Sequence, residues 1–350
     1  MDLKILYKML ETPSVSGNEL NFQKMLIEEL KDVTDVTYTH HSYTVTHGIN
    51  PNSNVKVMLL AHIDEIGLAI ENILDNGICK VTNVGSIRPY MYLGQHVNAI
   101  HYNEDKSFTK IPGVIGNNPE MTTGKLKVED LNVDFGFSSK EEALKHVSIG
   151  DVVLHEYTYK MLANNKLSAR ALDDKIGAYI CIEVLKRVKN KKSENGVYFV
   201  ATVGEETTGR GAKFATVNVQ PTISISLDVG SSTDVRYRDD FTHDVKLGNG
   251  PIITIASHAN EKLTKMIKAA ARKLEINLQP SVEISRTYTD MDNIYLQQKG
   301  IPSQLISIPL RYMHSSVEVC SLDDVEQIIN LLVELIVSLK ETDNFDPFID

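Results

Sequence analysis

The sequence predicts an α/β protein, with a doubly wound, mostly parallel sheet and a small β-barrel-like domain inserted into it. Near-continuous apolar runs, typical of strands buried on both faces, alternate with segments of helical periodicity. The middle of the chain instead has short alternating segments broken by Gly, Pro, Asn and Asp. With 350 residues, 42% of them hydrophobic, the chain also exceeds what one hydrophobic core usually absorbs.

The first segment is predicted to be helical and to lead into a buried strand. Ser16 to Glu19 has the S-x-x-E form of a capping box. Apolar residues follow at helical spacing, namely Phe22, Met25, Leu26 and Leu30. The apolar run at 55–61 then predicts a buried strand that prefers parallel neighbours.

Residues 69–162 have the texture of a small all-β domain. Strands are expected at 78–84, 97–101 and 151–157. Because this stretch lies between the first buried strand and the next long helix, we interpret it as an insertion. The predicted domains are therefore a discontinuous α/β domain, 1–68 and 163–350, and an inserted β domain, 69–162, that serves oligomerisation or substrate access.

Three more buried strands and three helices complete the predicted sheet. The strands are expected at 196–203, 222–227 and 303–308. The helices are expected at 174–189, 261–274 and 323–339, the last with Ser321 as its N-cap. Strands that alternate with helices favour a doubly wound parallel layer.

Bulk properties narrow the function classes. A net charge of -10 with few clusters of Lys and Arg argues against nucleic acid as a partner. No apolar run approaches the roughly eighteen residues of a membrane span. The three cysteines are scattered, cannot all pair, and lack metal-site spacing. The first residues carry no leader pattern, so we expect a reduced, cytoplasmic protein.

Acidic and imidazole side chains follow the predicted buried strands and precede one predicted helix. In chain order they are His62, Asp64, Asp173, Glu205, Glu206, Asp228 and His314. In an open α/β sheet, sites form outside the carboxyl ends of the strands. Carboxylates crowded together repel one another unless cations compensate, so these residues predict bound metal. Mixed nitrogen and oxygen ligands without cysteine suit zinc, cobalt or manganese.

Taken singly, each motif has an ordinary structural explanation. A lone His-x-Asp is more often a satisfied polar residue than a ligand. An Asp-Asp pair at a helix start usually caps the helix, and Glu-Glu after a strand can be a solvated loop. What favours a functional site is that all these signals fall at the same edge of the predicted sheet.

The motifs together resemble a known family. They read His-x-Asp-Glu at 62–65, Ala-Leu-Asp-Asp at 171–174, Gly-Glu-Glu-x-x-x-Arg-Gly-Ala at 204–212, Leu-Asp-Val at 227–229 and Arg-Tyr-Met-His-Ser at 311–315. Their order resembles the dinuclear metalloaminopeptidases that include glutamyl and deblocking aminopeptidases, some of which carry an endoglucanase label. The similarity covers essentially the whole chain.

The resemblance implies roles by position. Asp173 would bridge two divalent metal ions per subunit, with zinc expected first and cobalt or manganese as alternatives. His62 and Asp228 would complete the protein ligands of one ion, and Glu206 and His314 those of the other. Glu205 would be the general base, and Asp64 would orient His62. Relatives often have a cis peptide between the two aspartates at 173–174.

The resemblance also implies an activity and an assembly. A metal-activated water would hydrolyse the first peptide bond of peptide substrates, and twelve subunits would form a hollow tetrahedral particle. After Asp228 the chain has Val229-Gly230 where many relatives have Thr-His, which bears on substrate preference. A preference for acidic residues would need a basic pocket, for which the candidates are Arg236, Arg238, Arg286 and Arg311.

Three other functions compete with an aminopeptidase. A related dinuclear exopeptidase or deacylase would share the ligands and differ only in its substrates. A glycosidase needs two carboxyls that flank one bond and leaves His62 and His314 unexplained. A non-catalytic scaffold would tolerate the loss of Glu205 or Asp64, and both are present.

Overall fold

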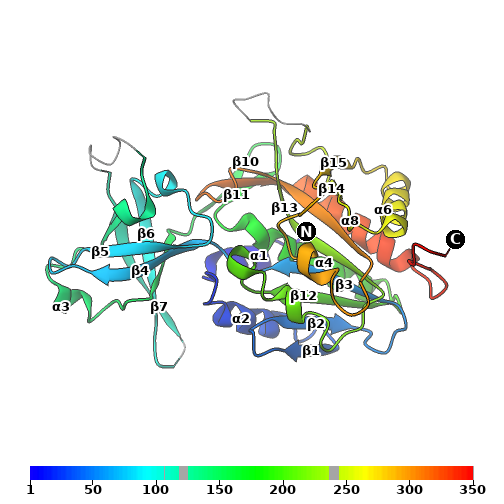
Figure 1. Cartoon of the computed structure of the whole chain (residues 1–350), viewed down its shortest axis with the longest axis horizontal. Coiled ribbons are helices and arrows are strands. Elements are labelled where there is room, and N and C mark those ends of the chain that lie inside the picture. Colours follow the sequence, from blue (N-terminus) through cyan, green and yellow to red (C-terminus); the bar gives the residue numbers. More distant parts are fainter. Residues whose placement is uncertain (106, 118–124, 236–243, 350) are drawn as a thin grey trace.

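The protein combines a large mixed sheet with a closed barrel (Figure 1). The computed structural model describes residues 1–105, 107–117, 125–235 and 244–349. The barrel lies at one end of the molecule and the sheet with its helices at the other. This arrangement confirms the predicted fold class.

The large sheet has a parallel centre and antiparallel flanks. Its strands are β1 (Val36–Thr39), β2 (Val45–Ile49), β3 (Lys56–His62), β10 (Tyr159–Leu162), β11 (Lys166–Ala169), β12 (Gly196–Thr202), β13 (Ile223–Ser231), β14 (Ile252–Ile255), β15 (Gln279–Val282), β16 (Ser303–Arg311) and β17 (Glu318–Ser321). The order β12-β3-β13-β16 is parallel throughout. Every residue of β12 is buried, as predicted for a strand covered on both faces.

Helices cover both faces of this sheet. The helices of this part of the molecule are α1 (Lys4–Glu11), α2 (Leu20–Leu30), α4 (Leu172–Asn190), α5 (Glu205–Thr208), α6 (Glu261–Lys273), α7 (Met291–Ile294) and α8 (Leu322–Ser338). Helix α3 (Lys140–Ala143) lies with the barrel instead, where Ala143 packs into the barrel core. On one face α4 packs against β3, β12, β13, α1 and α8. On the other, Met58 and Tyr198 pack with Ala212 and Ile294. No helix within the described ranges is both long enough and apolar enough to cross a membrane.

The barrel closes in the order β4-β5-β8-β7-β6-β9. Its strands are β4 (Gly67–Ile73), β5 (Cys79–Val84), β6 (Gln95–Tyr102), β7 (Phe108–Ile115), β8 (Asn132–Asp134) and β9 (Val152–His155). It has a core of its own, which includes Leu68, Val81, Val97 and Val153. The domain boundaries at 68/69 and 162/163 stay a prediction.

The predicted capping box is wrong. Helix α2 begins at Leu20, its N-cap residue is Glu19, and no side chain caps it. The hydroxyl of Ser16 donates instead to the Asp64 carboxylate, and the buried Glu19 carboxylate pairs with Arg210 at 2.9 Å. A long-range network therefore replaces the local cap. Ser321 does occupy the N-cap position of α8, but its hydroxyl makes no capping hydrogen bond.

Strand register brings the carboxyl ends of the central strands to one edge. Thr202 at the end of β12 is paired with His62 at the end of β3. Asp228 in β13 is paired with Ser307 in β16. The polar residues that follow these strands in sequence must therefore lie near one another, which is where the site forms.

Candidate metal and active site

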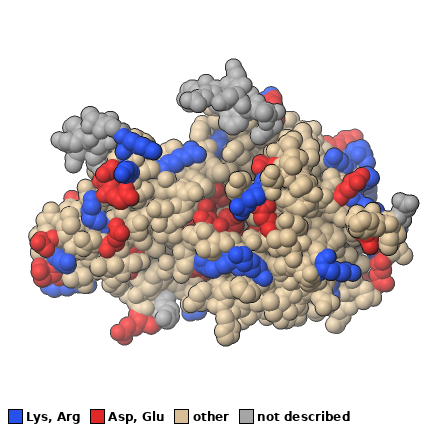
Figure 2. All heavy atoms as spheres, viewed as in Figure 1, with Lys and Arg blue, Asp and Glu red and all other residues tan. Residues whose placement is uncertain are grey.

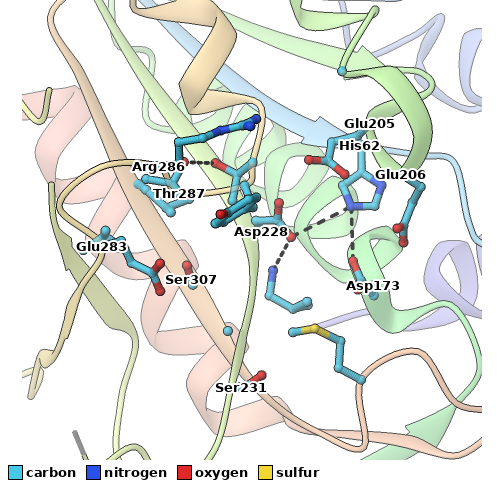
Figure 3. Close-up of a pocket in the computed structure, with 18 of the residues that line it drawn as sticks. His62, Asp173, Glu205, Glu206, Asp228, Ser231, Glu283, Arg286, Thr287 and Ser307 are labelled. Atoms are coloured by element: carbon cyan, nitrogen blue, oxygen red, sulfur yellow. Dashed lines mark hydrogen bonds and ion pairs between the residues drawn. The ribbon is translucent and has the colours of Figure 1, made fainter. Parts of the chain in front are cut away.

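Five segments at this edge carry the predicted site residues, and Figure 3 shows His62, Asp173, Glu205, Glu206 and Asp228 among them. His62 ends β3 and Asp64 follows it, Asp173 lies at the start of α4, Glu205 and Glu206 open α5, Asp228 lies in β13, and His314 lies between β16 and β17. The turn into α5 depends on Gly204, whose φ is 63°. This left-handed backbone conformation favours glycine, which has no Cβ.

Asp173 lies at the centre of the cluster. Its Oδ1 is 3.1 Å from Nε2 of His62, and its Oδ2 is 3.2 Å from Nε2 of His314. The His62 Nε2 is also 3.9 Å from Oδ1 of Asp228, and the His314 Nε2 is 3.5 Å from Oε1 of Glu206. One carboxylate thus joins two imidazole–carboxylate halves.

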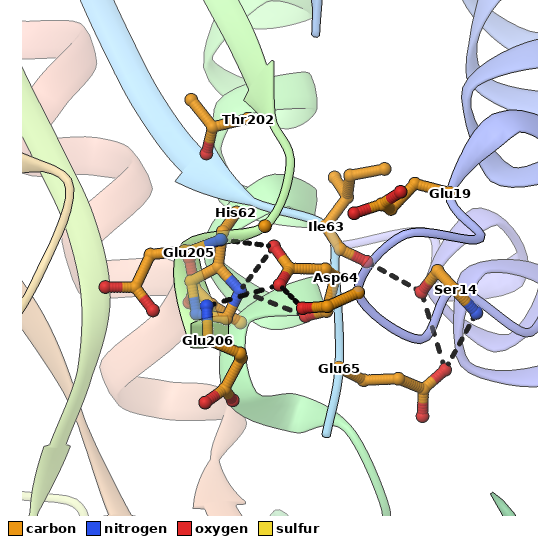
Figure 4. A network of polar contacts seen from close by, with 12 residues as sticks. Ser14, Glu19, His62, Ile63, Asp64, Glu65, Thr202, Glu205 and Glu206 are labelled. Carbon is orange, nitrogen blue, oxygen red and sulfur yellow. Dashed lines mark hydrogen bonds and ion pairs between the residues drawn. The ribbon is translucent and has the colours of Figure 1, made fainter. Parts of the chain in front are cut away.

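Asp64 orients its neighbours through two different groups (Figure 4). Nδ1 of His62 donates to the backbone oxygen of Asp64 at 3.0 Å, which turns Nε2 toward the cluster. The Asp64 carboxylate is 3.7 Å from Nδ1 and accepts the backbone N–H of Glu205 at 3.0 Å and of Glu206 at 3.2 Å. The backbone of Asp64 therefore sets the ring, while its carboxylate fixes the start of α5.

The cluster holds an excess of buried acid. Burial is the largest of the effects that raise the pKa of Glu205 to about 10. The charge of Asp228 also raises this pKa, whereas the charge of His62 lowers it. Burial also holds the pKa of Asp228 well above its usual value. Burial lowers the pKa of His314, but contacts with Asp173 and Glu206 outweigh it and raise that pKa to about 11. Such mutual repulsion is what bound cations offset.

The donor set fits divalent metal. Two groups of residues place one ligand atom each within 4.8 Å of the others: His62 with Asp174 and Asp228, and His62 with Asp173 and Glu206. Imidazole and carboxylate donors without thiolate suit zinc, cobalt or manganese. The peptide between Asp173 and Asp174 is cis, as the resemblance implies.

Asp174 is a donor that the sequence reasoning did not select. Its side chain is fully buried, and its Oδ1 accepts the Gly177 backbone N–H at 3.1 Å. Its Oδ2 has no hydrogen-bond partner among the described residues. In the sequence, Asp174 was visible only as the second member of the Asp-Asp pair.

Glu318 and Asp290 are two further residues that the sequence reasoning missed. Buried Glu318 accepts the backbone N–H of Asp173 at 3.1 Å through Oε2 and that of His314 at 2.8 Å through Oε1. Buried Asp290 accepts a hydrogen bond from the Thr202 hydroxyl, and burial raises its pKa to about 6. For Glu318 the available signal was its position four residues after His314, and for Asp290 the pattern offered none.

The cluster opens into a cavity of about 790 Å³. On the face of the molecule that Figure 2 shows, acidic side chains gather in the middle, with basic side chains beside them. Of the arginines considered for an acidic specificity, Arg286 lines the cavity. Arg311 does not line it and pairs with Asp234 at 2.7 Å. Arg236 and Arg238 lie outside the described residues.

Solved structures with this fold include aminopeptidases. The TET aminopeptidase from the marine sediment archaeon Thaumarchaeota archaeon SCGC AB-539-E09 has a TM-score of 0.88 at 27% identity, over 96% of each chain. The TET1 peptidase of Pyrococcus horikoshii, described as assembling into a tetrahedron or an octahedral shell, has a TM-score of 0.84 at 30% identity, over 96% of this chain and 99% of its own. A Thermotoga maritima structure named as an endoglucanase has a TM-score of 0.76 at 28% identity, over 95% and 96%.

Sequence comparison gives the family. The lysyl aminopeptidase of Pyrococcus furiosus is 30% identical over 99% of this chain and 100% of its own length. The sequence model of the M42 glutamyl aminopeptidases matches residues 42–331. This chain therefore belongs to the M42 glutamyl aminopeptidase family, which confirms the resemblance drawn from the motifs.

Proposed function

We propose that this protein is a metal-dependent aminopeptidase that removes N-terminal residues from peptides with the help of two divalent ions. The observation that carries the proposal is the position of Asp173 between His62 and His314, with its two oxygens 3.1 and 3.2 Å from their Nε2 atoms. A carboxylate that faces two imidazoles through separate oxygens is suited to bridge two ions.

The two ions would be held by different halves of the cluster. His62 and Asp228 would hold one, Glu206 and His314 the other, and Asp173 both. Zinc is the first candidate, and cobalt or manganese fit the same donors. When bound, the ions would lower the pKa of a shared water toward neutrality and polarise the scissile carbonyl.

Glu205 is the proposed general base. It opens α5, lines the same cavity as the proposed ligands, and has its backbone fixed by the Asp64 carboxylate. Its carboxylate would take a proton from the attacking water and pass it to the departing amine.

The test is a panel of aminoacyl chromogenic substrates and short peptides, each with a free and an acetylated N-terminus. Metal-stripped protein would be assayed before and after zinc, cobalt or manganese is added. Release of the N-terminal residue only with metal, and only from free N-termini, is the expected result. Turnover restricted to blocked or C-terminal substrates would instead favour the related exopeptidase or deacylase.

We further propose that twelve chains form a homo-oligomer and that the protein is cytoplasmic. The inserted β domain (69–162) would lie at subunit contacts or at the entrance for substrate. The Pyrococcus horikoshii TET1 structures support this assembly, and exposed apolar residues of the barrel region such as Leu144 and Ile149 offer contact surface. Three unpaired, buried cysteines fit a reducing compartment. Light scattering should give twelve times 39.1 kDa, and monomer mass would remove the assembly.

A further inference from the structure

One wall of the cavity is the face of the large sheet beside Asp228. Asp228 in β13 pairs with Ser307 in β16, and Ser307 pairs in turn with Ile252 in β14. Residues paired across neighbouring strands present their side chains on the same face. The cavity wall therefore runs from Asp228 across two further strands.

The same face continues into β15. Thr254 in β14 pairs with Ser281 in β15, and the ladder extends one step because the Glu283 backbone N–H donates to the Ile255 oxygen at 3.0 Å. Side chains alternate along a strand, so Thr254 lies on the face of Ile252, and Glu283 on the face of Ser281. We call this wall the trough: it begins at the proposed metal ligand Asp228 and ends at Glu283, which lines the same cavity. Between them it is formed by Ser307, Ile252, Thr254 and Ser281.

The trough is lined by both aliphatic side chains and hydroxyl groups. Ile252 and Leu305 contribute buried aliphatic surface, whereas Thr254, Ser281 and Ser307 contribute hydroxyls. Such a lining suits a long side chain with an aliphatic stem and a polar tip. A purely apolar residue would leave the hydroxyls facing carbon.

The charge inside the trough is negative. Residue Glu283 is partly buried, and the hydrogen-bond partner of its carboxylate among the described residues is the Ser281 hydroxyl at 3.4 Å. In Figure 3, Glu283 lies with Ser307 on the side of Asp228 away from His62. A cationic group that reached this point would gain a charge-assisted hydrogen bond.

The basic residues of the cavity are placed differently. The Arg286 side chain is 65% exposed, lies 3.3 Å from Asp292 and stacks on Tyr288. Lys213, in the 3-10 turn Ala212–Phe214, is exposed. Ion pairs in such exposed positions contribute little. Glu283, rather than these cations, is therefore placed to select the substrate side chain.

We propose that the trough is the pocket for the N-terminal side chain and that it selects basic residues, lysine or arginine. The proposal rests on the aminopeptidase function proposed above. The aliphatic stem packs against Ile252 and Leu305, and the cationic tip binds Glu283. The pocket thus differs from the acidic specificity for which arginines were considered.

The experiment compares kcat/KM for the p-nitroanilides of L-lysine, L-leucine and L-glutamate, with metal-loaded wild type, Glu283→Gln and Glu283→Lys. The wild type is expected to favour lysine. Glu283→Gln should lower lysyl kcat/KM by about 10- to 100-fold, the scale of one charged hydrogen bond, and change leucyl kcat/KM little. Glu283→Lys should reverse the preference toward glutamate.

Two controls localise the effect. Glu261→Gln removes the same charge from an exposed position on α6 and should leave the lysine-to-leucine ratio unchanged. The 2,4-diaminobutyryl substrate carries an ammonium group on a shorter stem and should lose the advantage of lysine. Best turnover of the glutamyl substrate, or an equal loss on all substrates in Glu283→Gln, would overturn the inference while leaving the aminopeptidase intact. No turnover of any substrate would overturn the proposed function itself.

Discussion

Glu318 offers the sharpest test of how the cluster is held. Its two oxygens accept the backbone N–H of Asp173 and of His314, which belong to different elements. Glu318→Gln keeps one acceptor oxygen, so one of these buried N–H groups loses its partner. An unsatisfied buried donor costs about 1–3 kcal/mol. Because both N–H groups belong to proposed ligands, metal affinity should fall as well, by about 10- to 100-fold, as for other groups that orient ligands.

Asp324 provides a matched control. It is also a buried carboxylate that accepts two backbone N–H groups, those of Gly248 at 2.7 Å and Gly250 at 2.8 Å. None of these residues is a proposed ligand. Asp324→Asn should therefore lower the free energy of unfolding by a similar amount without changing metal affinity.

The assay pairs urea unfolding of metal-free protein with zinc titration against a competing chelator. The expected result is that both variants are destabilised and only Glu318→Gln binds zinc more weakly. Equal zinc affinity in wild type and Glu318→Gln would refute the positioning role. An equal loss of zinc affinity in both variants would show that general destabilisation is the cause.

Three further predictions follow from the site and the core. Glu205→Gln should retain both metal ions, as measured by elemental analysis. Its kcat should fall by about 10²–10⁴-fold, which is the scale of general-base catalysis. Full activity of this variant would refute the role of Glu205 as general base. Asp173→Ala should lose both metals, and retained stoichiometric metal would contradict bridging. Burial lowers the pKa of His47 to about 4, so its neutral form is favoured in the folded state. Its contribution to stability is therefore full above about pH 6.5 and is lost as pH falls toward 4, by about 1.4 kcal/mol per pH unit. Relative to His47→Leu at fixed protein concentration, wild type should lose about 3 kcal/mol of unfolding free energy over that range, and a constant difference would contradict this.

The sequence predicted the sheet centre and the barrel strands because burial leaves a strong mark on composition. The run at 55–61 became β3, and the helix expected at 261–274 became α6 (Glu261–Lys273). The buried strand expected at 196–203 became β12, in which every residue is buried. The candidate residues could be selected for a similar reason, since polar side chains directly after buried strands are conspicuous.

Features that depend on contacts between residues far apart in the chain could not be predicted from the sequence. Ser16 and Glu19 satisfied a local capping pattern, but their side chains bind Asp64 and Arg210, far along the chain. Glu318 acts on backbone groups, which leave no pattern in side-chain types. The wall that ends at Glu283 depends on the register of four strands, which no local periodicity specifies.

The central claim is that two metal ions per chain, joined by Asp173, are needed to release N-terminal residues. The most direct test adds zinc stepwise to metal-free protein and follows binding and N-terminal release in the same samples. Negligible release without metal and saturation of both signals at two ions per chain are the expected results. Full release without metal, or metal bound at two ions per chain with no release from any free N-terminus, would contradict it.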